Sequence, residues 1–279
     1  MTTIDTALPR SASPTTGGWR WTLVDGWTVV RRDVQHLLHN PGEIIGMLVF
    51  PIIMIVMFGY IFGSAIPIPG GGNYREYLIP GMFVMSAAAQ VAVTMQKVAA
   101  DNGTGLMERF RSMPMARSAV PFGQTGADLF TGALGLVVMI ACGLVTGWRI
   151  HNGFPQALAA FGIVLLFGYA LNWVGVFCGF MINNEDTADR LSPLFMPVTM
   201  ISNTFVPTAG MPTWLRDIAD WNPISAVVAA CRQLFGNPGV VASGSWPLEH
   251  PITASIGWSI VLLLIFVPLS VYRYRTVGR

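Results

Sequence analysis

Few residues in this chain of 279 have the type and spacing that chemistry requires. A phosphate-binding loop needs a lysine followed by serine or threonine, but the only lysine, Lys97, is followed by Val98. The four histidines do not have the spacing of metal ligands, and no HExxH or serine-nucleophile motif occurs. The sequence therefore predicts no catalytic residue, no metal site and no ATP site in this chain, and it disfavours an enzyme.

A second group of polar residues lies within otherwise apolar sequence. Its densest part, Thr199–Thr204, is close to Pro193, Pro197 and Pro207, and prolines weaken a helix. We predict that a path for a transported compound is lined by Met54, Gln90, Thr199, Ser202, Asn203, Thr204 and Phe205. Alternatively, the polar residues of this group form hydrogen bonds between helices. We predict that structural role for Asn172 as well.

The elements that must position these residues are six apolar stretches. A helix of about 20 apolar residues crosses a hydrocarbon layer roughly 30 Å thick. The predicted spans are residues 44–63, 77–98, 120–148, 157–182, 190–209 and 252–272. Only 11% of the residues are charged, against about 25% in soluble proteins. We therefore predict an all-α, polytopic membrane protein with six transmembrane helices and no sizeable soluble domain.

Charged residues bear on both orientation and mechanism. With the N-terminus in the cytoplasm, 12 of the 16 basic residues lie on the cytoplasmic side, which predicts cytoplasmic N- and C-termini. The aromatic residues expected at the outer interface are Tyr74, Tyr77, Trp148, Trp214, Trp221, Trp246 and Trp258.

Asp128 is expected at the opposite, cytoplasmic membrane surface, so the buried ionisable relay of a proton pump is not predicted. Because the basic residues follow topology, we predict no nucleic-acid partner.

The segment before the first span has two parts. Residues 1–18 are predicted to be a disordered tail. From Trp19 to His39, apolar residues recur at helical spacing between charged ones. This amphipathic helix, which includes Trp27, Arg31 and Arg32, is expected to lie in the inner membrane interface. The alternative is a helix packed on a soluble domain. The first span is expected to serve as an uncleaved signal anchor.

The loop between the second and third spans is the most polar internal segment. Within residues 104–118, an apolar stripe runs between charged residues, a pattern that suits docking into a groove of another protein. The residues predicted to make this contact are Leu106, Glu108, Arg109, Phe110, Arg111, Met113 and Pro114. The alternative is a solvated loop whose arginines only set the topology.

The segment after the fifth span is unusually apolar for an outer loop. Asn222 and Pro223 suit the cap and first turn of a helix, and the apolar run that follows is too short to span. We predict two short outer helices that dip into the outer leaflet as a re-entrant pair. An ordinary extracellular loop is the alternative.

Taken in order, these segments resemble the permease subunits of ABC-2-type exporters, and most of all actinobacterial drug-resistance permeases of the daunorubicin-efflux type. The resemblance covers residues 19–275 as one transmembrane domain. It rests on the six spans, on Glu108–Pro114, which is similar to the family's cytoplasmic motif, and on Met211–Leu215, Asn222–Ser225 and Arg232, which are similar to its outer-helix signature.

The resemblance implies a complex of two permeases, identical or paralogous, with two ATP-binding subunits that hold ATP and Mg²⁺. Residues 104–118 would form the coupling helix seated in the ATPase, and the first, second and fifth spans would line the dimer interface and the path. The complex would move a hydrophobic or amphipathic compound outward across the cell membrane of an actinobacterium. Export of a lipid or glycan intermediate of the cell envelope, or a proton-coupled carrier, are the alternatives.

Overall fold

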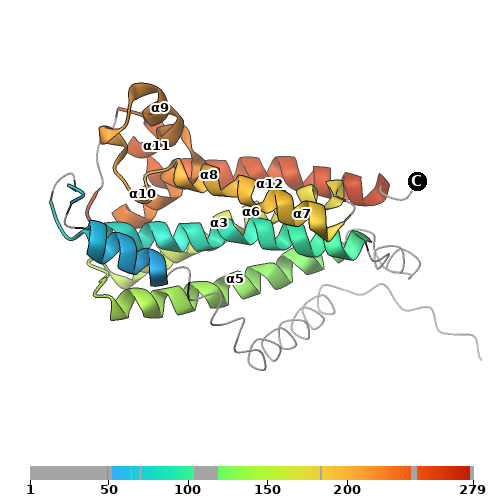
Figure 1. Ribbon diagram of the computed structural model, residues 1–279, viewed down its shortest axis with the longest axis horizontal. Coiled ribbons are helices and arrows are strands. Elements are labelled where there is room, and N and C mark those ends of the chain that lie inside the picture. Colours follow the sequence, from blue (N-terminus) through green and yellow to red (C-terminus); the bar gives the residue numbers. More distant parts are fainter. Residues whose placement is uncertain are drawn as a thin grey trace, which may run out of the picture.

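The computed structural model describes residues 49, 52–63, 65–68, 71–103, 119–182, 184–239 and 244–276. All regular structure within these ranges is helical. The four long apolar helices, each able to cross a membrane, are α3 (Tyr74–Gly103), α5 (Ala119–Val145), α6 (Phe154–Met181) and α12 (Pro251–Thr276). They run side by side along the long axis of the molecule (Figure 1). The prediction of an all-helical polytopic membrane protein is confirmed, with long helices over four of the six predicted spans.

Helices α3 and α6 form the centre of the bundle. They pack against each other more extensively than any other pair, and both contact α5 and α10 (Pro223–Phe235), while α6 also contacts α12. The most apolar stretch is 67% buried in α3 and 44% buried in α6, compared with 22% in α5 and 17% in α12. The peripheral helices expose large apolar side chains such as Val137 and Leu264. Such surfaces need lipid or another subunit to cover them.

Glycines bring α3 and α6 into close contact. A Cβ atom at Gly179 would lie 2.6 Å from Val98 Cβ, and one at Gly175 would lie 2.7 Å from the carbonyl oxygen of Val91. Small residues four apart allow two helix backbones to approach each other in a membrane. The Gly175–Gly179 pair on α6 therefore sets the distance between the two central helices.

The first predicted span is described only at residue 49 and from residue 52. Its apolar helix Ile52–Phe62 ends in a π-helical turn, η1 (Met57–Phe62). The tail at residues 1–18, the interfacial helix predicted at 19–39 and the coupling segment at 104–118 lie outside the described residues. Their predicted structures therefore stay predictions.

The fifth predicted span, residues 190–209, is not a continuous helix. The chain forms α7 (Glu185–Leu191), a 3₁₀ turn η2 (Ser192–Leu194) and the short α8 (Phe195–Met200). Irregular backbone follows, and then a second 3₁₀ turn, η3 (Thr208–Gly210). In place of six continuous spans, the described residues contain four long apolar helices and two shorter ones, Ile52–Phe62 and Pro223–Phe235.

Three short helices gather at one end of the bundle (Figure 1). They are α9 (Thr213–Trp221), α10 and α11 (Trp246–Glu249). Helix α9 exposes Trp214, Ile218 and Trp221 at helical spacing, while Ala219 on its other face is buried. An amphipathic helix with exposed tryptophans suits a membrane–water interface. Two short helices are thus present over the predicted segment, as α9 and α10, and their place in the outer leaflet stays a prediction.

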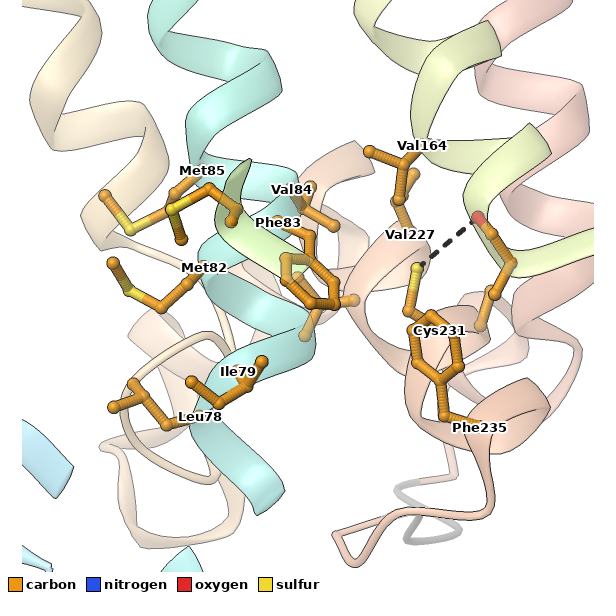
Figure 2. Close-up of a cluster of buried hydrophobic side chains, with 14 of the residues drawn as sticks. Leu78, Ile79, Met82, Phe83, Val84, Met85, Val164, Val227, Cys231 and Phe235 are labelled. Carbon is orange, nitrogen blue, oxygen red and sulfur yellow. Dashed lines mark hydrogen bonds between the residues drawn. The ribbon is translucent and has the colours of Figure 1, made fainter. Parts of the chain in front are cut away.

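The core lies where α3, α6 and α10 meet. Figure 2 shows Phe83 of α3 directed toward Cys231 and Phe235 of α10. The Phe83 ring lies edge-on to Phe235 and to Trp148, with centroid distances of 6.1 and 5.2 Å. Such pairs are worth about 0.5–1.5 kcal/mol beyond the area that they bury. Trp148 is fully buried in protein, and its predicted depth at the outer interface stays a prediction. This cluster fixes α10 against the end of α3.

Candidate functional site: an interrupted helix held by Tyr74, Tyr77 and Arg232

The interruption of the fifth predicted span has a local cause. Helix α8 ends at Met200, and Ile201 leaves the helical region with ψ of 67°. The Ser202 hydroxyl donates to the carbonyl of Thr199 (2.7 Å) and accepts from the backbone N–H of Thr204 (3.3 Å). Serine and threonine side chains that bond to nearby backbone compete with the helix ladder in this way. Residues 201–207 consequently carry backbone groups that need partners elsewhere.

Three side chains from distant helices supply partners for the carbonyl groups of this segment. Tyr74 of α3 donates its hydroxyl to the carbonyl of Phe205, and Tyr77 donates to that of Asn203, both at 2.7 Å. Arg232 of α10 donates from Nη2 to the carbonyls of Asn203 (2.9 Å) and Thr204 (3.1 Å). Irregular backbone at membrane depth is stable only where protein or a water-filled cavity satisfies it. Tyr74, Tyr77 and Arg232, here called the carbonyl clamp, meet this requirement.

Arg232 is a fully buried cation whose partners are neutral. Its Nε donates to the carbonyl of Tyr77 (2.9 Å), and its guanidinium lies 3.5 Å from the centre of the Tyr77 ring. In the part of the chain that the structure describes, Arg232 forms no ion pair with a carboxylate. Carbonyl dipoles and the electron-rich face of the ring therefore stabilise the charge. The planar guanidinium suits this task because its donors are fixed in a fork.

Asn222 and Ser225 tie the same segment to the start of α10. The Asn222 amide donates to the carbonyls of Val198 (2.8 Å) and Ile201 (2.6 Å), which the end of α8 leaves without helical partners. Its oxygen accepts from the N–H of Ile224, so it also caps α10, as its place before Pro223 predicted. Ser225 Oγ accepts from the N–H of Asn203 at 3.0 Å.

Helix α3 approaches the interruption closely at Gly81. A Cβ atom there would lie 2.7 Å from Thr204 Cγ2 and 3.2 Å from the carbonyl oxygen of Thr204. On the other side, the ring of Phe205 packs on Phe58 of η1, with ring centroids 4.5 Å apart. The irregular segment is thus enclosed by α3, η1 and α10.

The structure brings most of the predicted path residues together. Ser202, Asn203, Thr204 and Phe205 are buried at the interruption, and Thr199 lies just before it. Met54 is partly buried against the main core. Gln90 lies elsewhere, in a pocket between α3, α5 and α6. The predicted coupling and interfacial-helix residues lie outside the described ranges.

Sequence reasoning missed the clamp. Tyr74 and Tyr77 were predicted only as aromatic residues near the outer interface, whereas the structure shows that both side chains are buried in protein and donate to carbonyl groups. Arg232 stood out only as part of a family motif. A signal was available, because Arg232 follows eight apolar or small residues, Ile224–Cys231, in a helix too short to span. A cation in such a place needs a protein partner.

Comparison with known proteins agrees with this architecture. The family model described as ABC-2 type transporter matches residues 25–235. The daunorubicin resistance ABC transporter permease protein DrrB1 of Streptomyces coeruleorubidus is 27% identical, over 95% of both chains. The doxorubicin resistance ABC transporter permease protein DrrB of Mycobacterium tuberculosis is 28% identical over 85% of both. A putative transport permease, ycf38, of Cyanophora paradoxa is 20% identical over 86% of this chain and 84% of its own. The chain belongs to the ABC-2 type transporter family of membrane permeases.

Proposed function

We propose that this chain is the membrane subunit of an exporter that moves a hydrophobic or amphipathic compound, a drug or a lipophilic metabolite, out of the cell. The observation that carries the proposal is the similarity to a daunorubicin resistance permease along 95% of both chains. The apolar surfaces of α5 and α12 and the enclosed, interrupted segment support a membrane-embedded role.

The energy source is a separate subunit. Permeases of this family lack an ATPase domain, and membership in an ABC transporter implies an ATP-binding partner. We propose that ATP and Mg²⁺ bind in that partner, and that a second permease copy, identical or paralogous, completes the complex. The excess of basic residues in the predicted cytoplasmic segments supports N- and C-termini in the cytoplasm and a place in the cell membrane.

The coupling proposal gives the most direct test of this function. Phe110 and Arg111 are proposed to seat in a groove of the ATP-binding subunit. Truncating an anchoring side chain costs about 2 kcal/mol or more when it is a binding hot spot, which is a loss of more than about tenfold in affinity. The double variant Phe110→Ala, Arg111→Ala should therefore lose co-purification of the ATP-binding subunit, or lose hydrolysis stimulated by daunorubicin.

The matched control is Arg10→Ala, which removes a similar charge from the predicted cytoplasmic tail, outside residues 104–118. It should retain both assembly and stimulated hydrolysis, since a charge outside a binding contact usually contributes under about 0.5 kcal/mol. Normal assembly with normal stimulated hydrolysis in the double variant would contradict the coupling role and favour the alternative, a solvated loop at residues 104–118. Absence of any ATP-dependent uptake of lipophilic compounds into inverted vesicles by the intact complex would refute the exporter.

Asn203 gives a separate test of the path. Its side-chain N–H₂ donates to the carbonyl of Ser225 (3.2 Å), whereas its Oδ1 is buried with no partner among the described residues. Asn203→Leu removes one hydrogen bond worth about 1 kcal/mol and also an unpaired acceptor. Assembly should therefore survive, while the relative transport rates of several compounds change. Unchanged rates for every compound, measured in inverted vesicles, would leave Asn203 with a packing role alone.

A further inference from the structure

Two arginines meet at one end of α5, beside exposed apolar surface. Arg75, in the first turn of α3, donates from Nη1 to the carbonyl of Thr146 (3.4 Å). Arg149, which follows α5 in the chain, donates from Nη1 to the carbonyls of Leu144 (2.7 Å) and Trp148 (2.8 Å). Both cations therefore lie against the same short segment, where the C-terminus of a helix carries partial negative charge.

Holding the end of α5 uses only part of each guanidinium. A guanidinium has five N–H donors. The bonds of Arg149 all come from Nη1, while Arg75 bonds from Nη1 and also from Nε, which donates to Asn73 Oδ1 at 3.4 Å. Among the described residues, neither arginine forms an ion pair with a carboxylate. The Nη2 groups of both arginines therefore have donors left for an anion.

The other charged groups on the predicted outer side leave these two cations uncompensated. The carboxylate of Glu76 faces His151, with Oε2 3.1 Å from Nε2. Arg232 is buried in the carbonyl clamp, and Arg216 donates from both Nε and Nη2 to carbonyls of the segment before α9. Arg75 and Arg149 thus differ from the other arginines of this side in having donors available at an exposed position.

Tyr60 of η1 adds an aromatic ring to the same place. Arg75 Nη1 donates to its hydroxyl (3.3 Å), and the guanidinium carbon lies 4.9 Å from the centre of the ring. Tyr60 is 55% exposed. A tyrosine with one apolar and one wet end suits the level of lipid headgroups. The two arginines are therefore expected at that depth, with α5 crossing the hydrocarbon beyond them.

An apolar stripe leads along α5 away from the arginines. Val137, Ala141 and Val145 are four residues apart, so they lie on one face of the helix, and all three are exposed. Leu144, whose carbonyl Arg149 binds, is exposed beside them. The cations and the stripe are therefore continuous. Such a surface matches a ligand that has an anionic head and a long apolar chain.

We propose that Arg75 and Arg149 bind the phosphate of an anionic phospholipid, with one acyl chain along Val137–Val145. Guanidinium groups bind phosphate through charge-assisted hydrogen bonds. A headgroup with net negative charge, as in phosphatidylglycerol, compensates the two cations, whereas the ammonium group of phosphatidylcholine offsets its own phosphate. A second copy of the chain fits this surface less well, because a symmetric contact would bring the same cations together.

The test measures binding of single lipid molecules to the purified full chain in neutral detergent, by native mass spectrometry. The first phosphatidylglycerol should bind at least about tenfold more tightly than phosphatidylcholine with the same acyl chains, since charge-assisted bonds are the strong ones. Arg75→Gln and Arg149→Gln should each remove most of this preference. Glutamine keeps an N–H₂ donor for the end of α5 but loses the charge. The unfolding midpoint without lipid reports whether each variant is folded.

Val145→Glu tests the site without removing either arginine. The residue is 87% exposed, so the change disturbs little packing, and the new carboxylate would pair with the cations in place of the lipid. The preference for phosphatidylglycerol should be lost here too. An unchanged preference in this variant would overturn the proposal even if the arginine variants failed to fold.

The matched control is Arg216→Gln, which removes the same charge from the same predicted side. It should keep the preference, because Arg216 is already bonded to carbonyls. An equal fall in all three glutamine variants would assign the effect to net charge, and equal affinity of the unmodified chain for both lipids would refute the site. Displacement of phosphatidylglycerol by equimolar inorganic phosphate would assign the arginines to a free anion instead. Since neither ATP nor transport is involved, the inference does not rest on the proposed function.

Discussion

Replacing Arg232 by leucine is expected to destabilise the protein more than any other single change at the interruption. The variant leaves the carbonyl of Thr204 without the donor that the structure shows for it, and it removes one of two donors to Asn203. A buried acceptor left unpaired costs about 1–3 kcal/mol. The midpoint of thermal unfolding in detergent, followed by tryptophan fluorescence, should fall clearly, and yield in membranes should fall with it.

Arg232→Lys separates charge from geometry. A lysine keeps the cation but cannot present a planar fork to carbonyls of two segments, so most of the loss should remain. The control is Gln233→Leu, a change at the adjacent exposed position, which should leave the midpoint unchanged. An unfolding midpoint of Arg232→Leu equal to that of the unmodified chain would show that the carbonyl clamp does not hold the interrupted segment.

Replacing Gly179 by valine is expected to push α3 and α6 apart. Even the first added carbon would lie 2.6 Å from Val98 Cβ and 2.9 Å from the carbonyl oxygen of Met95. Backbone and β-carbon atoms cannot turn away as a flexible side chain can. Overpacking costs about 1–3 kcal/mol and sometimes more. The unfolding midpoint should drop, and a cysteine pair placed across the two helices should cross-link more slowly.

Gly162→Val on the same helix is the matched control, because a Cβ atom there meets nothing within 4 Å. It should retain the midpoint and the cross-linking rate. If both valine variants behave alike, the contact between α3 and α6 tolerates more volume than the structure indicates. If only Gly179→Val is impaired, the close approach is required for the native bundle.

Hydropathy predicted the long helices well because a membrane-spanning helix forms its backbone hydrogen bonds within itself. Helices α3, α5, α6 and α12 begin and end within about a turn or two of the predicted spans. The prediction of a continuous fifth helix was wrong because mean hydropathy carries no information about the partners of backbone hydrogen bonds. Residues 201–207 lie within a predicted span, yet the partners of their carbonyl groups are Tyr74, Tyr77 and Arg232, far away in the chain.

The site was predictable to a similar extent. Ser202, Asn203 and Thr204 stood out as a polar group, and the structure places them together. Their role could not be inferred from composition, since it depends on which helix faces them. The same holds for Gly175 and Gly179, whose four-residue spacing is visible in the sequence while their partner on α3 is not. The burial of Asp128 could not be predicted because Thr94 and Lys97, which pair with it, belong to another helix.

The order of synthesis removes a hazard that a fully buried arginine would otherwise create. Every carbonyl that Arg232 contacts belongs to a residue made before it, namely Tyr77, Asn203 and Thr204. Because a chain leaves the ribosome from its N-terminus, these acceptors are already available when Arg232 emerges. The cation can pass from water directly to its final partners without residing unpaired in lipid. A circular permutation that placed α10 ahead of α3 would lose this protection, although the finished contacts would be identical.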